Sequence, residues 1–190
     1  MLKQDLHIHT IFSTRDGSVV PEQTVSLVAS LEHAQVVGIS DHFETLVDGQ
    51  FDLYEKEVRQ AGLKLGVEVD GHAWSDEAAG YPVDYFIVHC RDQAADYRCL
   101  NRLLSAAKPV IIAHPNILDT NLNKVPPECL VEINNRYVWR TDWRKYYGPF
   151  TERFKFIIGS DAHQPFWLGQ SVAQHVAAQL GVEEFIVFGA

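Results

Sequence analysis

The sequence has few cysteines and no long apolar run. Cys90, Cys99 and Cys129 are the cysteines of the 190-residue chain, and no C-x-x-C pair occurs, so neither a disulfide framework nor a cysteine-type zinc site is expected. Cys90 directly follows His89, and we expect it to be a buried thiol rather than a nucleophile. Because there is no apolar stretch of about 18 residues and no basic, apolar leader before Asp5, we predict a cytoplasmic protein without a membrane span.

The chain also lacks an excess of positive charge. It has 16 Lys and Arg against 25 Asp and Glu, which gives a formal net charge of −9. This balance argues against a dedicated nucleic-acid-binding or anionic-membrane-binding surface. Internal repeats and low-complexity tracts are absent as well. The length fits a single domain over residues 1–190, and it falls short of the ~250 residues typical of an eight-fold barrel.

Seven short apolar segments are each joined to His, Asp or Glu. In chain order the polar groups are His7-Ile8-His9, Ser40-Asp41-His42, Glu68, His89, His114-Pro115, Glu132-Ile133-Asn134-Asn135 and Ser160-Asp161-Ala162-His163. In an extended strand, residues two apart share a face, so Asp5, His7 and His9 are expected on one side. Polar groups at the carboxyl ends of strands are typical of a parallel βα barrel, whose active site lies there. Clustered metal ligands explain this pattern better than unrelated core or surface histidines.

The segments between the strands show helical spacing of apolar residues. Helices are predicted over residues 21–33, 53–61, 94–107 and 170–180, the last ended by Gly181. Alternation of strands and helices favours a parallel sheet. We therefore predict an α/β fold, a distorted seven-stranded (β/α)7 TIM-like barrel. The segment from Tyr137 to Phe154 mixes Trp and Tyr with Arg and Lys, which favours an amphipathic helix; in the alternative, Arg136 or Arg140 binds a substrate phosphate.

Taken in order, the polar motifs resemble those of the PHP (polymerase and histidinol phosphatase) metallophosphoesterases. The matching motifs are Asp5-x-His7-x-His9, Gly38-Ile39-Ser40-Asp41-His42, Gly66-Val67-Glu68, His89, Ala113-His114-Pro115, Glu132-Ile133-Asn134-Asn135 and Gly159-Ser160-Asp161-Ala162-His163. They cover nearly the whole chain. A lone H-x-H pair would be a weak signal, whereas the ordered set is specific. The resemblance implies a PHP-type barrel of seven strands.

The resemblance also implies a centre of two or three divalent metal ions. The first ion would be held by His7, His9, Glu68 and Asp161, the second by Glu68, His89 and His114, and the third by His42 and His163. Where some members of the family have a further histidine, this chain has Arg15-Asp16-Gly17, and Asp16 is expected to replace it. In the alternative, Asp16-Gly17 is simply a turn. A shell of imidazoles and carboxylates suits Mn, Fe or Zn, and the resemblance favours Mn or Fe.

The function that this resemblance implies is phosphoester hydrolysis. The substrate would be a small phosphorylated metabolite or nucleotide, attacked by a hydroxide that the metal ions activate; nucleic acid is expected only as a short oligonucleotide. Asp161 or His163 would protonate the leaving group, and Arg15, Asn134 and Arg136 would bind the substrate.

Two other functions stay open. An amidohydrolase-like C–N hydrolase also begins with H-x-H on the first barrel strand, although that superfamily typically bridges its metals through a modified lysine and the corresponding position here is Glu68. The other is a non-catalytic or DNA-processing PHP domain that acts with a polymerase. Asp5 and Asp41 lie beside ligand motifs, and we expect them either to orient a ligand imidazole or to act as capping or turn carboxylates.

Overall fold

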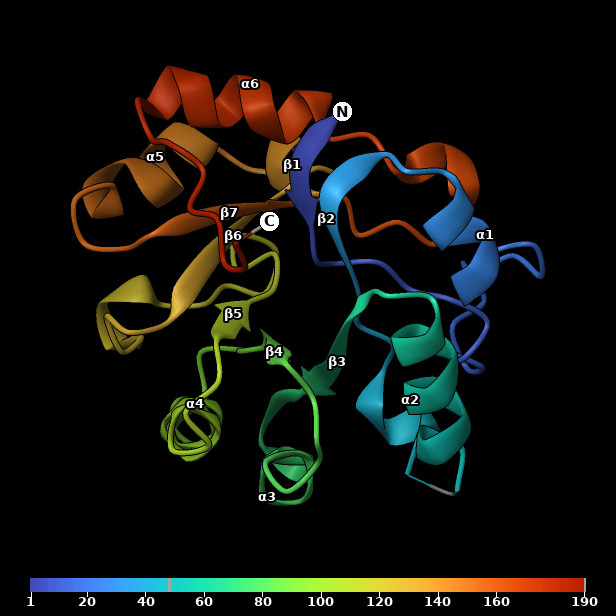
Figure 1. The fold of residues 1–190 in the computed structure, drawn as a ribbon. Helices are drawn as coiled ribbons and strands as arrows, with labels where there is room; N and C mark the ends of the chain where they lie inside the picture. Colours follow the sequence, from blue (N-terminus) through green and yellow to red (C-terminus); the bar gives the residue numbers. More distant parts are fainter. Residues whose placement is uncertain (48, 190) are drawn as a thin grey trace.

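Seven parallel strands surround the centre of the molecule (Figure 1). The computed structural model describes residues 1–47 and 49–189. The strands are β1 (Leu2–Asp5), β2 (Ala34–Ile39), β3 (Lys64–Asp70), β4 (Tyr85–His89), β5 (Val110–Ile112), β6 (Leu130–Asn134) and β7 (Phe156–Gly159). They pair in sequence order, each parallel to the next. The ring closes beyond β1, where Ile8 bridges Ala162 and the His9 amide donates to the Ala162 carbonyl at 2.9 Å. The predicted seven-stranded α/β barrel is confirmed.

The α-helices lie around the outside of this ring (Figure 1). They are α1 (Val25–Ser30), α2 (Phe51–Gln60), α3 (Ser75–Ala78), α4 (Ala94–Leu104), α5 (Trp143–Tyr147) and α6 (Ser171–Leu180). The helix predicted from residue 21 begins later, because the Thr24 side chain caps α1 by accepting a hydrogen bond from the Leu27 amide at 3.1 Å. As predicted, α6 ends at Gly181, whose φ of 70° suits glycine.

The aromatic segment from Tyr137 to Phe154 does not form the single amphipathic helix that its composition favours. It contains a 3-10 helix over Val138–Arg140, α5, and a second 3-10 helix over Gly148–Phe150. Thr141 is extended and interrupts the helix, and the Asp142 side chain starts α5 by accepting from the Lys145 amide at 3.2 Å. Helical periodicity alone could not reveal this break.

The interior of the barrel is filled by apolar side chains and by one tyrosine. Leu6, Ile87 and Ile157 belong to this inner cluster, and Tyr85 lies among them, fully buried, with its hydroxyl donating to the Leu6 carbonyl at 2.6 Å. Glycine is required at Gly38 in β2 and at Gly66 in β3 because a Cβ at either position would clash with the Tyr85 ring. A larger apolar cluster packs the helices against the outside of the strands.

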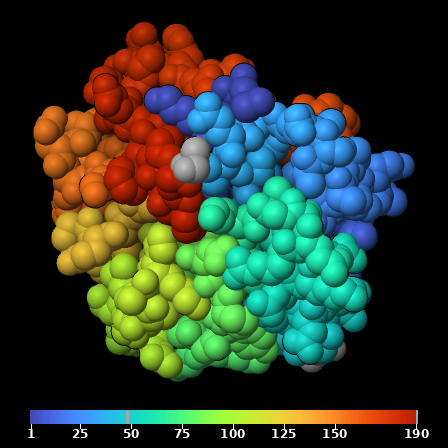
Figure 2. Space-filling model, in the orientation of Figure 1, coloured from blue at the N-terminus to red at the C-terminus, as the bar shows by residue number. Residues whose placement is uncertain are grey.

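The C-terminal segment covers the amino-terminal end of the barrel. Phe185, Val187 and Phe188 pack against the inner cluster, and the Phe185 amide donates to the carbonyl of Phe156, at the start of β7, at 2.7 Å. Gln4 in β1 donates to the Phe185 carbonyl at 2.7 Å. This red segment lies in the middle of the face shown in Figure 2. The opposite face carries the carboxyl ends of the strands.

The three cysteines lie in the interior of the protein. Cys90, Cys99 and Cys129 are buried free thiols, and burial raises the pKa of Cys90 to about 12, so the prediction of a buried thiol is confirmed. Within residues 1–47 and 49–189, no helix is both long and apolar enough to cross a membrane.

Candidate metal centre

The predicted ligands converge at the carboxyl ends of the strands. Eight of the nine line a single cavity of about 190 Å³, and the ninth, His7, is fully buried. They reach this place from β1, β2, β3, β4, β5 and β7 or from the loops that follow these strands. The topology of the barrel therefore brings together residues that lie far apart in the sequence.

The first group of ligands joins His7, His9, Glu68 and Asp161. The two histidine Nε2 atoms lie 3.2 Å apart, and Glu68 offers Oε1 at 3.1 Å from His7 and Oε2 at 3.4 Å from His9. Asp161 Oδ1 lies 3.7 Å from His7 Nε2 and 3.6 Å from His9 Nε2. Each of these four side chains is at least 97% buried. The resemblance implies this same group.

The second group shares Glu68 with the first. Its Oε1 atom lies 2.8 Å from His89 Nε2 and 3.7 Å from His114 Nε2, and these two nitrogens are 3.2 Å apart. Glu68 thus lies between two pairs of imidazoles, in the place that a bridging carboxylate requires.

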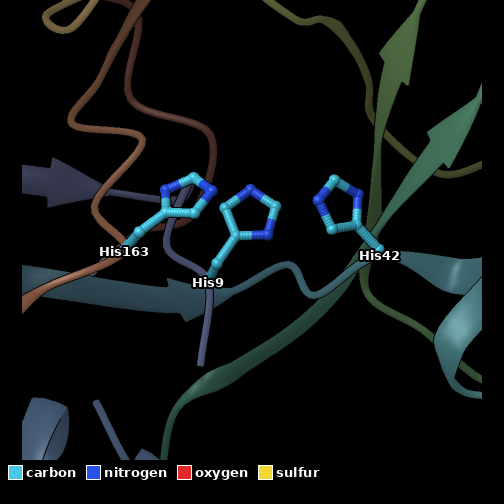
Figure 3. Close-up of side chains that lie close together, drawn as sticks. All are labelled: His9, His42 and His163. Atoms are coloured by element: carbon cyan, nitrogen blue, oxygen red, sulfur yellow. The ribbon is translucent and has the colours of Figure 1, made fainter. Parts of the chain in front are cut away.

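The third group lies nearer the solvent. His9, His42 and His163 each offer a nitrogen to one small region (Figure 3), with ring centroids 4.6 Å apart for His9 and His42 and 4.3 Å apart for His9 and His163. Asp16 Oδ2 lies 2.8 Å from His163 Nε2 and 3.4 Å from His42 Nε2. The structure therefore places Asp16 among these imidazoles, and Asp16 also accepts from the Ser18 amide as a turn aspartate does.

These groups fit divalent metal ions. Ligand atoms bound at about 2.0–2.2 Å in a tetrahedral shell lie roughly 3.4 Å from one another, and the distances within the first two groups range from 2.8 to 3.7 Å. The buried Glu68 Oε1 lies 2.8 Å from His89 Nε2 and 3.1 Å from His7 Nε2, so one carboxylate oxygen faces imidazole nitrogens of both groups. Buried histidines and carboxylates arranged in this way could bind divalent metal ions.

The backbone is strained at two of the ligands. Asp161 has a φ of 54° and His114 a φ of 25°, in the left-handed region that residues other than glycine rarely adopt. Strain of this kind costs about 1–3 kcal/mol and persists where a functional arrangement requires it. Glu32, Ala107 and Asp119, outside the ligand groups, share this conformation, so it sets the backbone at Asp161 and His114 and does not by itself mark a functional site.

Three further residues contact the Nδ1 atoms of predicted ligand histidines. This role was not predicted from the sequence for any of them. Glu132 Oε1 lies 2.8 Å from His7 Nδ1, Ser13 Oγ lies 3.2 Å from His9 Nδ1, and Asp70 Oδ1 lies 3.3 Å from His89 Nδ1. Such contacts fix the ring orientation and leave Nε2 for the metal.

Glu132 is the most constrained of the three. It is fully buried, and its Oε2 atom accepts from the His114 amide at 2.7 Å and from Asn134 Nδ2 at 2.9 Å. A Cβ on Gly159 would clash with its other oxygen. One carboxylate therefore supports His7 and the backbone of His114 together.

The expected orienting roles of Asp5 and Asp41 need correction. Asp5 contacts the Ser160 amide at 3.1 Å and His33 at 3.2 Å, and touches no ligand imidazole. Asp41 accepts from the Thr10 amide and from Ser13 Oγ, both at 2.6 Å. Asp41 therefore acts on His9 only through Ser13, and both aspartates anchor loops, which was the alternative expectation.

The charged side chains of the first two groups strongly affect one another's pKa values. Burial alone would lower the pKa of His7, but Glu132, Asp161 and Glu68 outweigh it and hold this pKa well above its usual value. For His9 burial prevails and the pKa falls well below its usual value. Burial opposes ionisation of Glu68, but His89, His7 and His9 keep its pKa well below the usual range. Glu68 is therefore an anion at neutral pH.

The imidazoles nearer the cavity hold protons tightly in the absence of metal. Burial lowers the pKa of His42, yet Asp16 and Glu68 raise it to about 11. For His89, Glu68 and Asp70 overcome burial and raise the pKa to about 9. A bound cation would have to displace these protons.

The predicted substrate-binding residues take three different positions. Arg136 lines the cavity, with Nη1 3.1 Å from His163 Nδ1 and 3.9 Å from Asp161 Oδ1. Asn134 is fully buried, donates to Glu132 and Asp161, and accepts from the Arg136 amide, contacts that favour a positioning role over direct contact with substrate. Arg15 is exposed and does not line this cavity.

Comparison with known proteins identifies the class of fold and goes no further. No family model and no curated protein sequence matches the chain. Among solved structures, the truncated form of 3-deoxy-D-arabino-heptulosonate 7-phosphate synthase from Thermotoga maritima is similar, with a TM-score of 0.53 and 15% sequence identity over 94% of this chain and 72% of that one. A likeness at this identity supports the barrel fold alone.

Proposed function

We propose that this protein is a metal-dependent phosphoesterase that hydrolyses a small phosphorylated metabolite or nucleotide. The observation that carries the proposal is the position of Arg136, whose guanidinium lies beside the buried cluster of histidines and carboxylates and next to His163 and Asp161. A guanidinium can donate two parallel hydrogen bonds to a phosphate. Beside a cluster that could bind divalent cations, it suits a phosphate better than a neutral amide.

The three ligand groups support a proposed place for each ion. His7, His9, Glu68 and Asp161 would hold one ion, Glu68, His89 and His114 a second, and Asp16, His42 and His163 a third; Mn or Fe is preferred over Zn. When bound, such ions lower the pKa of water and neutralise charge that develops on phosphate oxygens.

The protein residues do the rest of the work. Arg136 Nη1 donates to a non-bridging phosphate oxygen and orients the ester for in-line attack by water at phosphorus. Asp161 or His163 would accept a proton from the attacking water and pass it to the leaving alkoxide as the bond from phosphorus to the ester oxygen breaks. Glu132, Ser13 and Asp70 keep the ligand rings in place throughout.

Hydrolysis of a C–N bond is the competing proposal. Glu68 occupies the central position between the first two groups, and no lysine lines the cavity. This arrangement differs from centres that are bridged by a modified lysine, and we therefore favour phosphorus chemistry.

The test is product release with and without metal. Protein stripped with a chelator, and the same protein reloaded with manganese or iron, are assayed for phosphate release from a panel of phosphomonoesters, for cleavage of a nucleotide phosphodiester and for hydrolysis of a panel of amides. Metal-restored ester hydrolysis in at least one case is expected. Amide hydrolysis without ester hydrolysis would favour the C–N hydrolase, and silence across all panels despite metal binding would indicate a non-catalytic protein.

A further inference from the structure

A second cavity of about 360 Å³ adjoins the metal centre. Its walls include Asn135, Arg136, Phe166, Trp167, Gly169 and Ser171. Arg136 lines this side pocket and the cavity of the metal centre alike. A group bound in the side pocket and a phosphate at the metal centre would therefore both lie beside the Arg136 guanidinium.

Among residues 1–47 and 49–189, the side pocket is lined by two aromatic rings, one arginine and small or neutral polar residues, and by no acidic group. The rings of Phe166 and Trp167 meet edge to face with centroids 6.1 Å apart, and the Arg136 guanidinium lies 4.8 Å from the centroid of the Trp167 ring. None of the residues that line the pocket is Asp or Glu, although the chain has a net charge of −9. Phe166 is 78% exposed and offers a large apolar surface to a ligand.

The pocket also has open space and an anchored rim. A Cβ on Gly169 would meet no atom within 4 Å, so there is room for a ligand above this residue. Asn135 Oδ1 accepts from the Val172 and Ala173 amides at 2.9 and 3.1 Å and thereby ties the end of β6 to the start of α6. An ordered rim lowers the entropy that binding must overcome.

We propose that the side pocket binds a nucleobase of the substrate while the phosphate of the same molecule lies at the metal centre beside Arg136. The inference rests on the proposed function and names the substrate class: nucleotides rather than aliphatic phosphates. Exposed aromatic rings and an arginine plane are the surfaces on which bases stack. A pocket without carboxylates also avoids repulsion of the anionic substrate.

The kinetic test uses a variant that fills the pocket and leaves the metal centre intact. Gly169→Leu should do so, and Gly148→Leu is the matched control, because its new Cβ also meets nothing within 4 Å and Gly148 lines neither cavity. With the manganese-loaded protein, Gly169→Leu should raise KM for adenosine 5′-monophosphate about tenfold with little change in kcat. KM for glycerol 3-phosphate should not change, and Gly148→Leu should resemble the wild type with both substrates.

A second measurement does not depend on catalysis. Calorimetric titration of the chelator-stripped protein should show binding of adenosine but not of ribose, and Gly169→Leu and Phe166→Ala should weaken adenosine binding while Gly148→Leu should not. If glycerol 3-phosphate and adenosine 5′-monophosphate are hydrolysed alike and Gly169→Leu changes neither, the base pocket is overturned and the phosphoesterase stands. If no ester is hydrolysed, the proposed function fails and the base pocket is judged from adenosine binding alone. Adenosine binding by the wild type that is lost in Gly169→Leu supports the base pocket. No adenosine binding by the wild type overturns it.

Discussion

The two ends of the barrel are built from opposite kinds of residue. At the carboxyl ends of the strands, buried histidines and carboxylates face one another at 2.8–3.7 Å, and His114 and Asp161 keep strained backbones. At the amino ends, Phe185, Val187 and Phe188 cover an apolar interior, and the amides of Phe185 and Val187 donate to the Phe156 carbonyl and to Gln4 Oε1. The first arrangement crowds buried charged groups at a cost in stability, whereas the second stabilises the fold. Substitutions that weaken metal binding at the carboxyl end should therefore leave the fold intact, and substitutions that lower stability at the amino end should leave metal binding intact.

The largest effect is expected from Glu68→Gln. Glu68 lies between both pairs of imidazoles, so loss of its charge should remove several kcal/mol of transition-state stabilisation and lower kcat at least about 10³-fold. Phosphate release and elemental analysis of bound metal check this, and circular dichroism should show an unchanged fold. Glu128→Gln, an exposed position at the other end of the barrel, is the control. Wild-type turnover in Glu68→Gln would contradict a shared carboxylate.

Glu132→Gln should have a smaller effect at the same end. Its carboxylate orients His7 and accepts from the His114 amide, and residues that support metal ligands in this way are worth about 10–100-fold in metal affinity. Manganese titration would measure the loss. An affinity equal to that of the wild type would mean that His7 does not depend on Glu132 for its orientation.

Phe185→Ala should change stability and spare the metal centre. Phe185 packs against the inner cluster but is only partly buried, so the free energy of unfolding should fall by about 2 kcal/mol. Denaturant unfolding measures this, with Phe166→Ala as a control of the same residue type at an exposed position. Loss of bound manganese in folded Phe185→Ala would show that the two ends are not independent.

Metal affinity should rise with pH. His42 and His89, with pKa values of about 11 and 9, hold protons at neutral pH, and a metal ion must displace them, so each displaced proton should raise the affinity by up to about tenfold per pH unit. Manganese titrations at three pH values between 6.5 and 8.5 test the slope. An affinity that is independent of pH would contradict protonated ligands in the metal-free protein.

The strands and the convergence of the ligands could be predicted from the sequence because short apolar segments are followed directly by His, Asp or Glu. Six of the apolar segments coincide with strands β2 to β7, whereas β1 ends at Asp5, before the predicted His7-Ile8-His9 segment. Because all carboxyl ends of strands meet at one face of a parallel barrel, the positions of Glu68, His89 and Asp161 could be predicted. The helix breaks between Tyr137 and Phe154 could not be predicted, because they depend on the backbone at Thr141 and on the cap at Asp142.

The residues that support the ligands were harder to find. Glu132 contacts His7 across 125 positions of sequence, and only one signal was available: Glu132 and Asn134 are two apart in a strand and so share a face. Asp70 has the same kind of signal, because it lies two residues after Glu68 in β3. Ser13 has none, because it lies in a loop that the sequence does not place. Two expectations from the sequence stay predictions: the alternative in which the chain acts with a polymerase, and the cytoplasmic location.

The most direct test is the number of metal ions that the carboxyl end of the barrel binds. Chelator-stripped protein is equilibrated with manganese, freed of unbound ions and analysed for metal per chain. Two or three ions are expected in the wild type, with a clear loss in Glu68→Gln and none in Phe185→Ala. Fewer than one ion per chain in the wild type, or equal binding by Glu68→Gln, would contradict a metal centre at this end.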